Sequence, residues 1–137
     1  MPEPASLRPH GATAEPVPDV RGRRILVVED EYMLAEDLRL ELEDAGAVVL
    51  GPAPSVADAL ALLADAEGGP PDAAILDLNL GGEMAYPVAD ALRERGVPVM
   101  LATGYDVQSI PAAYADVPRC EKPFDVGRCL SELFGST

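Results

Sequence analysis

The chain has 137 residues, which is room for one domain of ordinary size. It carries 24 acidic side chains against 10 basic ones, a formal net charge of -14, and 48% of its residues are hydrophobic, enough for a packed core. The acidic excess argues against partners that are nucleic acids or anionic membranes, because both need clustered lysine and arginine. With no apolar run of membrane-spanning length and no signal peptide, a cytoplasmic protein is expected.

A disordered, proline-rich tail is predicted over residues 1–22, and a folded domain over residues 23–137. The tail contains five prolines and no apolar periodicity. Proline fixes its own backbone angle φ and lacks an amide donor, so this composition disfavours regular structure.

The folded domain opens with a strand, a helix and a second strand. Residues 25–28 are a short apolar run, and leucines at four-residue spacing predict an amphipathic helix over residues 32–45. A second apolar run predicts a strand over residues 47–50. Gly51-Pro52 is expected to break that strand.

The middle of the chain repeats this alternation. Ser55 is a suitable cap for a helix that runs to about Ala66. A third strand is predicted over residues 73–76, followed by a loop that contains Gly81-Gly82 and by a helix that ends near Arg95.

The last part of the chain is less regular. A fourth strand is predicted over residues 97–102, and a fifth, weaker one over residues 117–121. Between them, residues 106–116 contain a proline that interrupts any helix, so a short or irregular fourth helix is expected. The final helix is predicted over residues 125–134, with its first residue as the cap.

Five apolar strands separated by helices predict a doubly wound α/β fold. Continuous apolar strands indicate a parallel sheet that is covered on both faces. In such a sheet ligands bind in the crevice at the carboxyl ends of the strands.

Polar and charged residues follow four of these strands directly. They are Glu29-Asp30, Asp77, Thr103 and Glu121-Lys122-Pro123. Alone, Asp77 would be interpreted as a turn or helix cap and Glu29-Asp30 as a solvated loop. The joint occurrence of such residues at the ends of the first, third and fifth strands is what indicates a site. Lys122 is the only lysine in the chain, which favours a specific role for it.

These residue types suit phosphoryl chemistry. Three neighbouring carboxylates repel one another, and Mg²⁺, or Mn²⁺ in its place, is the complement that oxygen ligands prefer. A carboxylate beside such an ion can attack phosphorus as a nucleophile. Lys122 would spread the charge of the transferring oxygens, and Thr103 could donate a hydrogen bond to one of them.

Residues 24–134 resemble the receiver domain of two-component response regulators. Four separated motifs carry the resemblance in the family's order: Ile25-Leu26-Val27-Val28-Glu29-Asp30-Glu31, Ile75-Leu76-Asp77-Leu78, Ala102-Thr103-Gly104-Tyr105 and Glu121-Lys122-Pro123-Phe124. The resemblance implies a flavodoxin-like (βα)₅ fold with strand order 2-1-3-4-5.

The resemblance also implies a role for each site residue. Asp77 would be the phosphoacceptor, and Asp30 and Asp77 would give side-chain oxygens to Mg²⁺. Glu29 would act on the metal through a bound water, and Asn79 through its backbone carbonyl. Lys122 and Thr103 would contact the phosphoryl group, which a sensor histidine kinase would supply from a phosphohistidine.

The chain departs from the family where most receivers carry a switch aromatic. That position, three residues before the lysine, is Arg119, while Tyr105 lies two residues after the threonine. The string from Met100 to Tyr105 is similar to the receiver subgroup named for its FATGUY motif, with Leu101 where the subgroup has phenylalanine. Members of that subgroup tend to be single-domain proteins paired with HWE or HisKA2-type kinases. Tyr105 is therefore a candidate substitute for the switch, and edge packing is its alternative reading.

The expected function is that of a single-domain response regulator and phosphoprotein, which signals through protein contacts rather than as a turnover enzyme. Phosphorelay shuttle, phosphate sink and allosteric partner all use the same site, and a histidine phosphotransfer protein is a further possible partner. The main alternative is a receiver-like adaptor that works without phosphorylation. A haloacid-dehalogenase-like phosphatase would need its Asp-x-Asp motif on the first strand, and a flavodoxin-like cofactor binder would need a phosphate loop there.

Two cysteines stand nine positions apart, which makes neither a disulfide scaffold nor a four-ligand zinc site. Cys120, inside the fifth strand, and Cys129, on the last helix, are interpreted as small hydrophobic core residues. A redox role for Cys120 is the minority interpretation.

Overall fold

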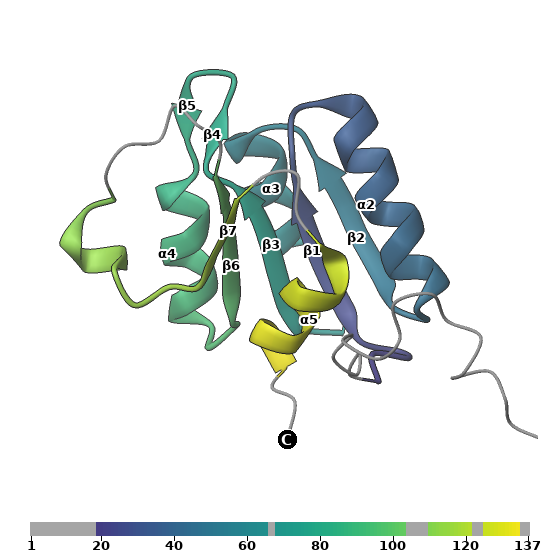
Figure 1. Ribbon diagram of the computed structural model, residues 1–137. Coiled ribbons are helices and arrows are strands. Elements are labelled where there is room, and N and C mark those ends of the chain that lie inside the picture. The colour runs from purple at the N-terminus through teal and green to yellow at the C-terminus, as the bar shows by residue number, and fades with distance from the viewer. Residues whose placement is uncertain (1–18, 66–67, 104–109, 122–124, 135–137) are drawn as a thin grey trace, which may run out of the picture.

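A five-stranded parallel sheet forms the centre of the molecule, in a computed structural model that describes residues 19–65, 68–103, 110–121 and 125–134 (Figure 1). Its strand order is β2-β1-β3-β6-β7, which is the expected 2-1-3-4-5 once a small hairpin between β3 and β6 is left out of the count. The strands are β1 (Arg24–Val28), β2 (Val48–Ala53), β3 (Ala73–Asp77), β6 (Val99–Thr103) and β7 (Arg119–Glu121).

Helices cover both faces of this sheet, as the doubly wound prediction requires (Figure 1). On one face lie α2 (Tyr32–Asp44) and α5 (Val126–Phe134), and on the other lie α3 (Val56–Ala64) and α4 (Tyr86–Glu94). Each face has its own apolar core. The central strands β3 and β6 are buried at every residue, which explains why their sequences are continuously apolar rather than alternating.

The helix ends follow the local signals in the sequence. The Ser55 side chain accepts a hydrogen bond from the backbone N–H of Asp58 at 3.1 Å, which caps α3 as predicted. Asp125 likewise accepts from the N–H of Arg128 at 3.3 Å at the start of α5. α2 ends one residue earlier than predicted and α3 about two.

The second strand was expected to end at Gly51-Pro52, and this prediction is wrong. β2 continues to Ala53, with an irregular register against β1. Because β2 is an edge strand, no neighbouring strand on its outer side needs a hydrogen bond from the N–H that Pro52 lacks. Glycine is needed at position 51, because φ is +92° and a Cβ would lie 2.9 Å from the Val27 carbonyl oxygen.

The segment after β3, where a loop containing Gly81-Gly82 was predicted, is a hairpin. Two short antiparallel strands, β4 (Asn79–Leu80) and β5 (Glu83–Met84), flank Gly81-Gly82. Both glycines have positive φ, +64° and +99°, which is what a type I′ hairpin turn requires. A Gly-Gly pair between two short runs was the available sequence signal.

A short or irregular fourth helix was predicted over residues 106–116, of which the structure describes residues 110–116. A single 3₁₀ turn, η1 (Ala112–Tyr114), follows Pro111 within the described part of that segment. The Tyr114 ring stacks on Tyr86 at 4.5 Å between centroids, and its hydroxyl donates to Asp90 at 2.7 Å. These contacts hold η1 against α4.

Residues 19–22, at the end of the predicted tail, contact the domain. Val20 is 1% exposed and packs with Ile25 and Val27 in one of the cores, and the N–H of Gly22 bonds to the carbonyl of Gly46. Packing therefore begins at least two residues before the predicted domain boundary, while the disorder of the remaining tail stays a prediction. No described helix is long and apolar enough to span a membrane.

Candidate functional site

Three acidic residues meet at the carboxyl-terminal edge of the sheet. Glu29 and Asp30 directly follow β1, and Asp77 is the last residue of β3. Because β1 and β3 are adjacent and parallel, their ends lie side by side. The structure brings these three of the predicted site residues together.

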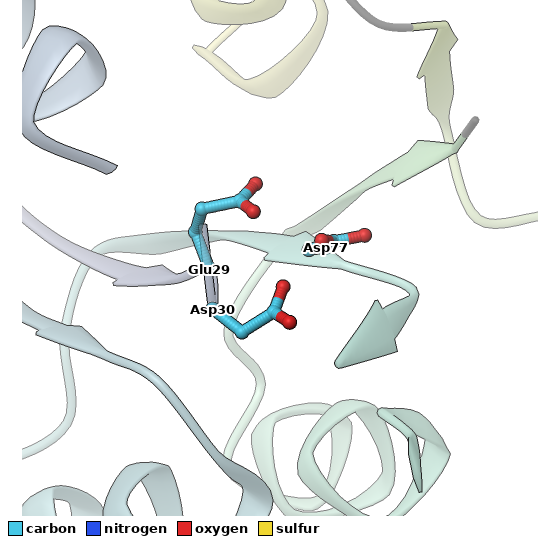
Figure 2. Close-up of side chains that lie close together, drawn as sticks. All are labelled: Glu29, Asp30 and Asp77. Carbon is cyan, nitrogen blue, oxygen red and sulfur yellow. The ribbon is translucent and has the colours of Figure 1, made fainter. Parts of the chain in front are cut away.

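The three side chains come close enough to share one cation (Figure 2). One carboxylate oxygen from each residue lies within 4.8 Å of the others. Glu29 is 4% exposed and Asp77 is 5% exposed, whereas Asp30 is exposed to solvent. Two carboxylates of the cluster are therefore buried, and the third, that of Asp30, lies on the side open to solvent.

Backbone amides orient these carboxylates. The N–H of Glu31 donates to Glu29 Oε2 at 3.1 Å, and the N–H of Asn79 donates to Asp77 Oδ1 at 3.2 Å. Hydrogen bonds of this kind restrict the rotation of a carboxylate. The chain thus positions the acids through the residues that follow each strand.

The β4–β5 hairpin forms the rim of the site, a part that the sequence reasoning missed. The N–H of Gly82 donates to Asn79 Oδ1 at 2.7 Å, which ties the turn to the residue after β3. A Cβ placed on Gly81 would lie 3.4 Å from Asp30 Oδ2. The turn therefore approaches the open side of the carboxylate cluster.

Thr103 ends β6, next to the end of β3 in the sheet. It is 8% exposed, and its hydroxyl donates to the carbonyl oxygen of Cys120 on β7 at 3.4 Å. Glu121, its register partner, ends β7 directly before Lys122 in the sequence. The predicted residues Lys122 and Tyr105 lie outside the described residues. Arg119, the other switch candidate, is on β7 and is exposed.

The donor set fits a hard divalent cation. Each member of the acidic cluster offers carboxylate oxygen, the ligand that Mg²⁺ and Mn²⁺ prefer over nitrogen and sulfur. Mg²⁺ keeps several waters and needs only one or two carboxylates, so an exposed Asp30 beside two buried acids suits it. The carboxylates of Glu29, Asp30 and Asp77 would hold the ion. The backbone carbonyl of Asn79, two residues after Asp77, is the further ligand that the sequence predicts.

The fold and this acidic edge define a doubly wound α/β protein with a cluster of three carboxylates at the strand ends that could hold a cation. The model of the response regulator receiver domain matches residues 25–128, and the chain belongs to that family. Receiver domains accept phosphoryl groups in two-component signalling and work with histidine kinases or phosphotransfer proteins; they are not turnover enzymes. The family expected from the four motifs is confirmed.

Solved structures agree with this assignment. The chain is similar to SdrG from Sphingomonas melonis Fr1, with 40% identity and a TM-score of 0.61 over 82% of this chain and 92% of that one. It is also similar to the BeF₃-activated conformation of SdrG from Pseudomonas melonis Fr1, with 42% identity and a TM-score of 0.67 over 80% and 94% of the two chains.

A receiver protein from Sinorhizobium medicae WSM419 shares the fold at 23% identity, with a TM-score of 0.66 over 82% of this chain and 91% of that one. A comparison with curated protein sequences gave no significant match.

Proposed function

We propose that this protein is a phosphorylation-dependent response regulator in which Asp77 accepts the phosphoryl group. The observation that supports this is the position of Asp77: it ends a fully buried strand, and its carboxylate lies within 4.8 Å of those of Glu29 and Asp30. The backbone N–H of Asn79 orients the Asp77 carboxylate. Because Asp77 is almost fully buried, only a small reacting group can reach this carboxylate.

The transfer breaks one bond and forms another. A carboxylate oxygen of Asp77 attacks the phosphorus of a phosphohistidine whose other ring nitrogen carries a proton, the P–N bond breaks, and its electron pair leaves with the ring as neutral imidazole. Bound Mg²⁺ or Mn²⁺ would neutralise charge on the phosphoryl oxygens. The Thr103 hydroxyl and Lys122 are the proposed partners of the same oxygens. Attack of water on phosphorus later breaks the P–O bond and restores the Asp77 carboxylate.

The proposed donor is a sensor histidine kinase, of the HWE or HisKA2 type that the resemblance to the FATGUY subgroup implies, or a histidine phosphotransfer protein. The output is proposed to be a protein contact, as a shuttle, a sink or an allosteric partner in the cytoplasm. The net charge of -14 favours a basic docking surface on that partner.

The test is the intact mass of the protein after incubation with Mg²⁺ and acetyl phosphate. One phosphoryl adduct is expected for the wild type, none without Mg²⁺, and none for Asp77→Asn. Asp37→Asn is the matched control, because Asp37 is an exposed residue of α2 outside the acidic cluster. It should be phosphorylated like the wild type.

An adduct that survives in Asp77→Asn would contradict the assignment of the acceptor. The adaptor function is favoured instead if the wild-type protein forms no phosphoryl adduct and the addition of Mg²⁺ and beryllofluoride causes no change in the protein. The specific feature behind that second candidate is Arg119, an exposed residue at the position of the usual switch aromatic. Beryllofluoride is the informative reagent because a similar protein, SdrG, has been solved in a BeF₃-activated conformation.

A further inference from the structure

The two cysteines of the chain, one on β7 and the other on α5, have their side chains in contact. The sulfur atoms of Cys120 and Cys129 lie 3.2 Å apart, and both are free thiols. Cys129 is fully buried in the core under α5, and Cys120 packs against the same core from the edge strand β7. The prediction that both pack as small hydrophobic residues is consistent with this, but the sulfur contact was not foreseen.

We propose that Cys120 and Cys129 form a peroxide-sensitive dithiol that closes to a disulfide and so links β7 covalently to α5. A disulfide needs sulfurs about 2.05 Å apart, so the two atoms must approach by roughly 1 Å. A contact at 3.2 Å between side chains already facing each other makes that approach a small adjustment.

The two cysteines have different roles in the oxidation. Burial, together with the hydrogen bond to Cys120, raises the pKa of the Cys129 thiol, so Cys129 keeps its proton. Cys120 is half-buried, so it is the sulfur that a small hydroperoxide reaches first. Cys129 then acts as the resolving thiol from inside the core.

The chemistry balances with hydrogen peroxide as the oxidant. The Cys120 sulfur attacks one peroxide oxygen, the O–O bond breaks, and a sulfenic acid and one water result. The Cys129 sulfur next attacks the Cys120 sulfur, the S–O bond breaks, and the displaced hydroxide leaves as a second water with the Cys129 proton. The two thiols lose two electrons and two hydrogens, and a dithiol reductant reverses the step.

The bond would act on the candidate phosphorylation site through Thr103. The Cys120 carbonyl oxygen accepts the Thr103 hydroxyl at 3.4 Å, a long contact that a shift of β7 alters readily. Cys120 is also two residues before Lys122 in the sequence. This regulatory consequence rests on the proposed function, whereas formation of the disulfide does not.

Thiol counting tests the disulfide directly. The reduced full-length protein is treated with hydrogen peroxide, unfolded in the presence of N-ethylmaleimide, and weighed as an intact chain. Two alkyl adducts are expected before oxidation, and none afterwards, with the chain still monomeric. Dithiothreitol should restore both adducts.

Single variants check that the bond is intramolecular and specific. Cys120→Ser and Cys129→Ser cannot form it, and Cys129→Ala replaces Cys129→Ser if the buried hydroxyl prevents folding. The proposal is overturned if both wild-type thiols stay alkylatable after peroxide treatment. It is also overturned if Cys120 reaches the sulfinic acid while Cys129 remains a thiol, or if the product is a disulfide-linked dimer.

The phosphorylation rate tests the regulatory consequence. Oxidised wild type should accept phosphoryl from acetyl phosphate about 10-fold or more slowly than reduced wild type, since a displacement near 1 Å of a positioned group can cost up to about 100-fold. The phosphorylation rate of the double variant, with Cys120→Ser and Cys129→Ser, should not change on peroxide treatment. Equal rates for the oxidised and reduced wild type would overturn the coupling. If no adduct forms even in the reduced protein, the proposed function has failed, and the thiol count still decides the disulfide.

Discussion

At the scale of single residues, the site depends on what surrounds the carboxylates as much as on the acids themselves. Asp30 is exposed, and Gly81 of the β4–β5 turn is the residue that approaches it. The backbone of Gly81 has a positive φ, which favours glycine, and a Cβ at this position would be in van der Waals contact with the Asp30 carboxylate. Gly82 also has a positive φ, but a Cβ on it would have nothing within 4 Å.

This pair of glycines separates backbone strain from interference with the metal site. We expect Gly81→Ala and Gly82→Ala each to lower the free energy of unfolding by about 1 kcal/mol, because an alanine with positive φ is strained. Only Gly81→Ala should also weaken Mg²⁺ binding, by about 10-fold, as expected when a neighbour of a metal ligand is disturbed. Denaturant unfolding and NMR titration with Mg²⁺ measure the two effects. Equal Mg²⁺ affinities in the two variants would show that the turn does not act on Asp30.

At the scale of elements, α2 is a helix with a strongly acidic outer face. Arg39 is the only basic residue in the helix, and its guanidinium pairs with Glu36 at 2.7 Å and with Glu43 at 2.8 Å. Pairs at these helical spacings contribute a few tenths of a kcal/mol at most when exposed, but here one arginine offsets two carboxylates in a crowded negative surface.

The Arg39 pairs should make the stability of the protein depend on pH. The hydrogen bonds from Arg39 lower the pKa of Glu36 in the folded state. The pairing therefore stabilises the fold above the ordinary glutamate pKa and is lost as the pH falls through the lowered value. Arg39→Gln should have a lower Tm than the wild type at pH 7, and the gap should close on acidification.

Arg128→Gln is the matched control for this measurement. It removes the same charge from α5, where Arg128 is exposed and forms no ion pair with any described residue. Thermal unfolding followed by circular dichroism between neutral and acidic pH gives the comparison. If the two variants behave alike, the effect belongs to net charge and not to the ion pairs of α2.

At the scale of the whole molecule, repulsion between like charges opposes folding. The chain has a formal charge of -14, and the structure shows four ion pairs among the described residues, all of them partly or fully accessible to solvent. Pairs of this kind are too weak to offset the excess. The sheet and its two apolar cores therefore carry the stability of the fold.

Salt should consequently stabilise this protein. Raising KCl from about 0.01 M to about 0.15 M shortens the Debye length from about 30 Å to about 8 Å, which screens the repulsion over most of the surface. We expect the Tm to rise over this range, as measured by calorimetry at constant pH. A Tm that falls with added salt would show that the surface ion pairs outweigh the repulsion.

Periodicity and strand-end chemistry predicted the order of the main elements, the parallel sheet and the identity of the acidic cluster. These signals are local in the sequence. A strand that is buried on both faces, such as β3, is recognisable as a continuous apolar run, and Asp77 comes directly after that run. Topology alone then places the ends of adjacent parallel strands together. The positions of the strand ends and the topology of the sheet were therefore sufficient to predict the cluster of Glu29, Asp30 and Asp77.

Contacts between distant segments were decided only by the tertiary structure. The continuation of β2 through Pro52 depends on its place at the edge of the sheet, which no local pattern encodes. The approach of Gly81 to Asp30 and the 3.2 Å contact between Cys120 and Cys129 depend on how a turn and a helix pack against the sheet. Residue types and their spacing determine which elements form and which chemistry is present. Packing between those elements determines which side chains touch.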